Sequence, residues 1–150
     1  MSGDHPLAAA WTRVRNVVGS TAATYREEGR EVVEVVADHA TVRGSDDPVT
    51  LSFTVPGDAA DELAAAVDDD ATYRTEVQYV DVDGTRLFVL EVRAPEAPVV
   101  LLAGGVGHDS LRPHASDPDA PARTLVRRVD GGEAAQFGHE RVAPFVDKLG

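Results

Sequence analysis

The sequence predicts an α+β fold, a mainly antiparallel sheet with two helices packed on one face. Two segments have the composition and spacing of helices, and most of the remaining chain consists of β-branched runs separated by Gly, Asp and Pro. The order is helix, strands, helix and then further strands, which is not the alternation typical of parallel α/β folds. At 150 residues the chain suits a single domain with its own core, over residues 1–150.

The first predicted helix spans about residues 6–28. Its apolar residues recur at spacings of three and four and therefore share one stripe: Leu7, Trp11, Val14, Val18, Ala22 and Tyr25. Asp4 is placed to cap the start of this helix, and Gly29 suits the left-handed residue that follows its end.

Three strands are predicted next, at residues 32–36, 41–43 and 49–55. In the last of them apolar residues alternate with Thr and Ser, which is the period of a half-buried strand. A second helix is expected to open at Asp58 and to continue to Val67, because Ala and Leu dominate this segment and acids lie in its first turn.

The strongest local signal is a β-hairpin around Asp83-Gly84, a dipeptide suited to a two-residue type I′ turn. That turn sets the register, so Tyr79 faces Phe88 and apolar residues share their face. The opposite face carries arginines and glutamates at diagonal positions, among them Glu76 and Arg93, and we expect it to face solvent.

The second half of the chain contains three more predicted strands. Residues 99–103 are apolar at every position and should form an interior strand covered on both faces. Two further strands, at 123–129 and 133–137, are joined by Asp130-Gly131-Gly132 and should close the domain.

The charge of the chain indicates where the protein works. The formal net charge is −12, there is no cysteine, and Lys148 is the only lysine among 14 basic residues. The missing thiols exclude thiolate zinc sites, iron–sulfur clusters and cysteine nucleophiles. A cytosol of very high salt favours proteins with a hydrated acidic surface. At molar salt the Debye length falls to about 3 Å, so the repulsion among the acidic side chains of one chain is largely screened. The alternative is an ordinary acidic protein encoded by a GC-rich genome.

We therefore expect a halophilic protein in the cytoplasm. The N-terminus lacks the basic and apolar regions of a signal peptide, and no apolar run approaches the length of a membrane span, so we expect no membrane association. The negative charge also disfavours nonspecific binding to nucleic acid.

The most irregular segment is a Gly/Pro/Asp-rich stretch at about residues 104–121, which we expect to be a long loop. One hypothesis makes it a metal site of nitrogen and oxygen ligands, with these candidates: His108, Asp109, His114, Asp117 and His139. No metal-ligand motif supports that spacing, so a solvated polar loop is the simpler interpretation.

Other chemistry is poorly supported. The glycines at 104, 105 and 107 follow a strand but have no helix with a lysine behind them, as a phosphate loop would require. No nucleophile elbow occurs. A structural, hydrogen-bonded role for His139 and ion pairing for Arg127 and Arg128 are the simpler interpretations. We expect no catalytic residue and no cofactor.

Several stretches together resemble a known family. They are the helix with Trp11 and Tyr25, the Val-rich strand after it, the hairpin between Tyr79 and Val92, and the C-terminal residues 124–145. With these features the chain resembles a family of small haloarchaeal proteins described as a domain of unknown function. The resemblance implies a halophilic origin and a single α+β domain, and it implies no activity.

These observations favour a noncatalytic binding or protein-interaction module with a protein partner. The first alternative is a metal-dependent enzyme that uses residues 108–119. The second is a nucleic-acid-associated factor that binds through arginines.

Overall fold

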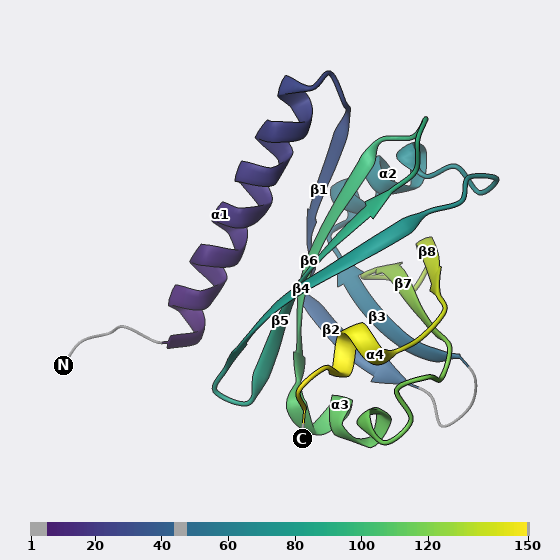
Figure 1. Ribbon diagram of the computed structural model, residues 1–150. Coiled ribbons are helices and arrows are strands. Elements are labelled where there is room, and N and C mark those ends of the chain that lie inside the picture. The colour runs from purple at the N-terminus through teal and green to yellow at the C-terminus, as the bar shows by residue number, and fades with distance from the viewer. Residues whose placement is uncertain (1–5, 44–47, 150) are drawn as a thin grey trace.

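The computed structural model describes residues 6–43 and 48–149 (Figure 1). The α+β class is confirmed, since helices and two four-stranded sheets form within these residues. Asp4, the expected helix cap, lies outside the described residues. The elements are α1 (Pro6–Glu27), β1 (Val32–Val36), β2 (His39–Arg43), β3 (Val49–Val55), α2 (Gly57–Ala66), β4 (Arg74–Val82), β5 (Thr85–Arg93), β6 (Val99–Gly107), α3 (His108–Ala115), β7 (Ala122–Arg128), β8 (Glu133–His139) and α4 (Ala143–Val146).

Most predicted elements lie within two residues of their expected bounds. Gly29 follows α1 with a φ of 83°, as the left-handed position requires. The second helix begins one residue earlier than expected, at Gly57, and Asp58 lies in its first turn.

The sheet arrangement differs from a single, mainly antiparallel sheet. The first sheet has the strand order β1-β6-β5-β4, and the second has the order β2-β3-β7-β8. Each sheet contains one parallel pair, β1 with β6 and β3 with β7. Each of these pairs joins segments far apart in the chain, as Val32 opposite Val99 illustrates. Local sequence patterns report the strands but not such distant pairings.

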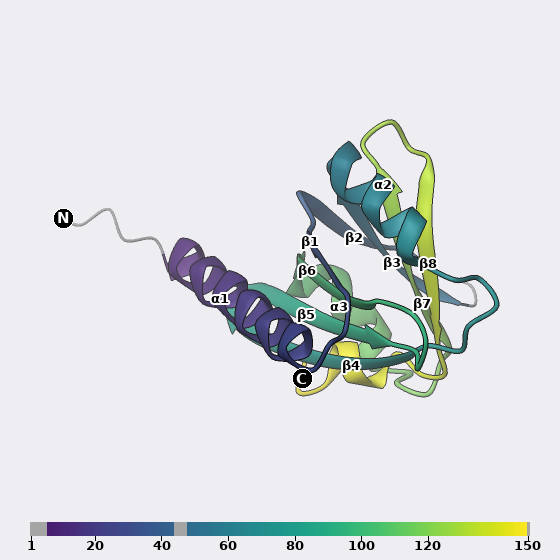
Figure 2. The ribbon, with the colours of Figure 1, turned by 90° about the horizontal axis from the view of Figure 1, so that it is seen from above.

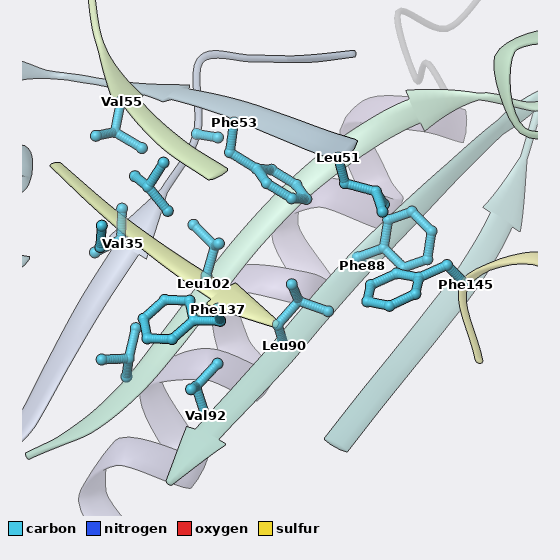
Figure 3. Packing of buried hydrophobic residues seen from close by; sticks show 14 of the residues in the cluster. Val35, Leu51, Phe53, Val55, Phe88, Leu90, Val92, Leu102, Phe137 and Phe145 are labelled. Atoms are coloured by element: carbon cyan, nitrogen blue, oxygen red, sulfur yellow. The ribbon is translucent and has the colours of Figure 1, made fainter. Parts of the chain in front are cut away.

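The elements form layers. Helix α1 lies along the outer face of the first sheet, where its apolar stripe meets residues of β5 and β6 (Figures 1 and 2). The other face of that sheet packs against the second sheet, and Phe53, Phe88 and Phe137 lie in the core between them (Figure 3). Helix α2 packs at another place, against β1, β7 and β8, so α1 and α2 do not share a sheet face.

The chain passes directly from one sheet to the other after β1. The backbone N–H of Ala37 donates to the carbonyl of Ala103 in the first sheet, at 2.8 Å, and the N–H of Asp38 donates to Thr54 in the second, also at 2.8 Å. The two sheets are therefore joined at a corner, where their backbones come close together.

The prediction of a long loop over residues 104–121 is wrong for the first part of this segment. Strand β6 continues to Gly107, which pairs with Thr85, and α3 occupies His108–Ala115. Only residues 116–121 connect α3 to β7 without a helix or strand. Two of the glycines that suggested a loop lie where packing leaves little room: a Cβ at Gly104 would overlap the Phe53 ring, and one at Gly105 would come within 2.8 Å of Leu87. A Cβ at Gly107 would meet nothing within 4 Å.

The hairpin is confirmed in turn and register. Asp83 and Gly84 have φ values of 49° and 76°, as a type I′ turn requires, and Tyr79 pairs with Phe88. The expected diagonal pair also forms, since Arg93 Nη2 donates to Glu76 Oε1 at 2.7 Å. This face is not wholly exposed, because α1 covers the part formed by β5.

Candidate functional site

Strand β4 forms one edge of the first sheet. It has nine residues and pairs with β5 only, so one side of its backbone has no neighbouring strand. Exposed edges of this length are places where another chain can add a strand. This makes the edge of β4 the first candidate for a functional surface.

The hairpin geometry decides which backbone groups of β4 are open. Val82 and Thr85 flank the two-residue turn and form a hydrogen-bonded pair, and such pairs alternate along an antiparallel ladder. The residues between them therefore turn their N–H and C=O groups away from β5: Thr75, Val77, Tyr79 and Asp81. Within the described residues, these backbone groups have no recorded hydrogen-bond partner.

An apolar groove lies beside the second half of β4, where α1 and the hairpin meet. Its volume is about 150 Å³. We call it the apolar groove, and its lining residues are Arg13, Val14, Val17, Gln78, Tyr79, Val80, Leu87 and Val89. Val17 is 41% exposed, although it is a large aliphatic residue beside a hydrophobic cluster. The groove thus presents uncovered aliphatic surface directly beside the open strand.

A larger cleft lies beside the first half of β4, between this strand, the end of β8 and α4. Its volume is about 500 Å³. We call it the arginine cleft, and its lining residues are Tyr73, Arg74, Thr75, Glu76, Val77, Arg93, Gly138, His139, Glu140, Arg141, Pro144 and Phe145.

The arginines of this cleft differ in how they are paired. Arg93 is bonded to Glu76 and to the Tyr25 hydroxyl. The nearest ion-pair partner of Arg141 is Asp119, at 3.6 Å, and both side chains are mostly exposed. In the part of the chain that the structure describes, Arg74 has no recorded hydrogen bond or ion pair. Arg74 and Arg141 are therefore available to an anionic group.

His139 belongs to the inner wall of the arginine cleft. Its Nε2 lies 2.8 Å from Thr124 Oγ1, and its ring centroid is 5.0 Å from that of Phe145. Burial lowers the pKa of His139 to about 4, so the imidazole is neutral near pH 7. The expected structural, hydrogen-bonded role of His139 agrees with this geometry.

A buried ionic cluster around Arg86 holds β4 in place against α4. Arg86 is 0% exposed, and its Nε and Nη2 donate to the two carboxylate oxygens of Asp81 at 2.8 and 3.0 Å. Its Nη1 donates to the carbonyl of Phe145 at 3.2 Å, and its guanidinium lies 3.7 Å from the ring centroid of Tyr79. The hydrogen bonds from Arg86 hold the pKa of Asp81 below its ordinary value.

Two further contacts complete this cluster. His108 Nε2 lies 2.9 Å from Asp81 Oδ1, and the Tyr79 hydroxyl donates to Asp147 Oδ2 at 3.0 Å. Partial burial, together with the Asp147 carboxylate, raises the pKa of Tyr79. The cluster therefore ties α4 and the start of α3 to the hairpin, and through the carbonyl of Phe145 it holds one lining residue of the arginine cleft. The hairpin register already places Asp81 opposite Arg86, but only the tertiary structure shows that Arg86 is buried.

The structure does not bring the five metal candidates together. His108 is bonded to Asp81 of β4, whereas His139 is bonded to Thr124 of β7. Asp109 forms an ion pair with Arg112, and its side chain is 97% exposed. His114 is half-buried near the end of α3, and Asp117 is exposed. Among residues 6–43 and 48–149, no three His, Asp or Glu side chains are arranged to hold a metal ion.

The three arginines of β7 also have separate partners. Arg123 donates to Thr50 Oγ1 at 3.0 Å, Arg127 donates to the carbonyl of Gly131 at 2.9 Å, and Arg128 pairs with Asp61. Ion pairing was expected for both Arg127 and Arg128. It is found for Arg128, whereas Arg127 contacts a backbone carbonyl. These contacts leave no cluster of open guanidinium groups on β7.

Comparison with known proteins identifies one family. Residues 2–147 match the model of a family of unknown function (DUF7529). The comparisons with curated proteins and with solved structures found no match. Within the described residues, no helix is both long and apolar enough to cross a membrane.

Proposed function

The chain belongs to this family of unknown function, DUF7529, and on the evidence of its own residues we propose that it is a noncatalytic interaction module. The proposed partner is an extended segment of another protein, which adds to the first sheet along β4. The observation that carries the proposal is the row of open backbone groups at Thr75, Val77, Tyr79 and Asp81, with a hollow on each side of the strand.

Backbone pairing and side-chain hollows have different roles in this mode of recognition. Main-chain hydrogen bonds to an open strand supply affinity for any extended segment, and pockets for alternate side chains supply specificity. Successive side chains of the added strand point to opposite faces of the sheet. The apolar groove lies on the face covered by α1. The arginine cleft reaches both faces at the open edge, with Arg74 and Arg93 on the α1 face and Thr75 and Val77 toward β8 and α4, so an added strand meets both hollows.

A rigid frame supports such a site. Adding a strand requires that the edge keeps its position, because a mobile edge would lose conformational entropy on binding. The fork from Arg86 to Asp81 and the contact between Tyr79 and Asp147 hold β4 against α4. The edge is therefore preorganised for pairing.

A different protein is a better partner than a second copy of this chain. In an antiparallel, twofold pair of β4 strands, Arg74 would meet Gln78, Val80 or Val82 in the registers that pair more than half of the strand. No such register gives it an acidic partner.

We also propose that the protein works in a cytosol of high salt. The net charge of −12 supports this, as does the exposure of acids such as Asp58, Asp61 and Glu62 on α2. Acidic side chains bind water strongly and are screened from one another at high ionic strength.

The test uses synthetic peptides of about nine residues, the length of β4, with alternating Thr and Val. Binding is followed by fluorescence anisotropy, and amide hydrogen exchange is measured by NMR. The expected result is slower exchange at Thr75, Val77, Tyr79 and Asp81 in the bound state. Unchanged exchange at all four amides with every peptide would overturn the proposal.

A proline variant provides the matched comparison. Thr75→Pro removes an outward N–H and leaves the ladder to β5 intact, whereas Gln78→Pro removes an inward N–H. We expect Thr75→Pro to weaken peptide binding at least about tenfold with a small change in melting temperature. Sedimentation of the free protein tests whether a second copy of the chain covers the edge instead. A dimer that protects the same four amides from exchange would show that it does, and would overturn the partner proposed here.

A further inference from the structure

We infer which side chains the captured segment presents, an inference that rests on the proposed capture of a strand by β4. It presents an aliphatic side chain to the apolar groove and a carboxylate side chain to the arginine cleft. Arg74 shares the face of β4 that carries Gln78 and Val80 of the groove, so these two residues of the partner lie an even number of positions apart. The partner is therefore an acidic, partly apolar extended segment.

Charge is the first argument. The residues that line the two hollows include four arginines and two glutamates, which is a local charge of 4 − 2 = +2. The whole chain has a charge of −12. A neighbouring hollow between α2 and β8 is lined by Asp68, Asp69 and Glu133, with no basic residue. The lining of these two hollows is thus net positive, in a chain that is acidic as a whole.

The pairing state of these arginines is the second argument. Arg93 is already matched by Glu76, at 2.7 Å. Arg74 has no ion-pair partner within the described residues, and Arg141 has only Asp119, at 3.6 Å. A guanidinium presents a planar fork that fits a carboxylate with two hydrogen bonds. Arg74 is the group that a carboxylate of the partner would engage.

The apolar groove is the third argument. Its volume of about 150 Å³ suits one aliphatic side chain, and its walls are mainly Val and Leu side chains. Filling it would cover Val17, which is 41% exposed in the free protein. The only charged residue in its lining is Arg13 at the rim, which again favours a partner with acidic rather than basic flanks.

His139 keeps the cleft selective over a wide range of pH. Because burial lowers its pKa to about 4, the imidazole carries no charge near pH 7. The positive charge of the cleft comes from arginines alone, which stay protonated at all ordinary pH values. Recognition of the carboxylate should therefore change little between about pH 6 and pH 9.

The experiment compares three peptides of about nine residues that share one Leu for the groove and differ at the position facing the cleft, where they carry Glu, Gln or Lys. We expect the Glu peptide to bind about tenfold more tightly than the Gln peptide, and the Lys peptide to bind most weakly. Arg74→Gln should reduce the Glu-over-Gln preference. Arg112→Gln, which alters an exposed ion pair on α3, should leave it unchanged.

The outcomes separate this inference from the proposed function. If the Glu and Gln peptides bind equally and Thr75→Pro abolishes the binding of both, strand capture is supported and the acidic specificity is overturned. A preference for the Lys peptide would overturn it as well. If none of the peptides binds and the β4 amides exchange as in the free protein, strand capture itself is overturned.

Discussion

The guanidinium of Arg86 stacks on the ring of Tyr79, 3.7 Å from its centroid, with no part of the Arg86 side chain exposed to solvent. Tyr79 is a residue of the open edge strand, so the buried cation lies directly behind the proposed binding surface. The same guanidinium bonds to both oxygens of Asp81 and to the backbone of α4. One arginine therefore connects the stability of the fold to the shape of the edge.

Replacement of Arg86 should be strongly destabilising. Arg86→Leu removes the cation from Asp81 and leaves the carbonyl of Phe145 without its donor. We expect a loss of about 3 kcal/mol in the free energy of unfolding, measured by urea titration. The control is Arg112→Leu, which breaks an exposed pair and should cost less than about 1 kcal/mol. Equal losses in the two variants would show that the buried cluster contributes little.

Gly104→Ala tests the close approach of the two sheets. The added methyl group would overlap the ring of Phe53, which is 0% exposed and cannot swing into solvent. A loss of about 1–3 kcal/mol is expected from overpacking. Gly19→Ala is the matched change in α1, where a Cβ meets nothing within 4 Å, and it should be neutral or stabilise by up to about 1 kcal/mol. Thermal unfolding of both variants measures the contrast, and a loss in Gly19→Ala as large as that in Gly104→Ala would contradict it.

Acid should destabilise the protein through His139. Its pKa is about 4 in the folded state against an ordinary value of 6.5, so the unfolded chain binds more protons between these two values. This contribution to stability is fully present above about pH 6.5 and is lost as the pH falls toward 4. The difference corresponds to about 3 kcal/mol. His139→Asn should flatten this part of the profile measured by urea unfolding, and an unchanged slope would contradict the assignment.

A second acid-dependent contribution comes from Asp81. Its pKa is lowered in the folded state, so it stabilises the fold above the unfolded value and loses this contribution as the pH falls through the folded one. Asp81→Asn should therefore reduce the pH dependence below about pH 4, whereas His139→Asn acts at higher pH. The same urea series separates the two groups.

Salt should stabilise the protein if its acidic surface is an adaptation to high ionic strength. Raising KCl from about 0.1 M to about 2 M shortens the Debye length and screens the charge of −12. The melting temperature should rise over this range, as followed by circular dichroism. A melting temperature that falls with added KCl would contradict the proposal of a salt-rich cytosol.

The apolar groove can be tested independently of the arginines. Val17→Asp puts a carboxylate into its wall and should weaken binding of an apolar strand-forming peptide about tenfold. Val129→Asp makes the same change at a residue that is 72% exposed between β7 and β8, away from the groove. Binding should be unaffected there. Equal effects of the two variants would indicate a general effect of charge.

The candidate site shows which features can be derived from local sequence. The Asp83-Gly84 turn and the alternation around it predicted the β4–β5 register, including the position of Asp81 opposite Arg86. The open backbone groups of Thr75 and Val77 follow from that register only when β4 is known to be an edge. Strand order is decided by pairings over long sequence separations, which no local pattern reports.

By itself, the sequence determined the α+β class, α1, the hairpin and most strand bounds, because each depends on neighbouring residues and on a period of two or 3.6. The tertiary structure decided the rest. The two parallel pairings divide the strands into two sheets, leave β4 at an edge and bury Arg86 against α4. The same packing turns Gly104 from an expected loop residue into the place where Phe53 meets β6. These features depend on which distant segments exclude water together, and that is a property of the whole fold.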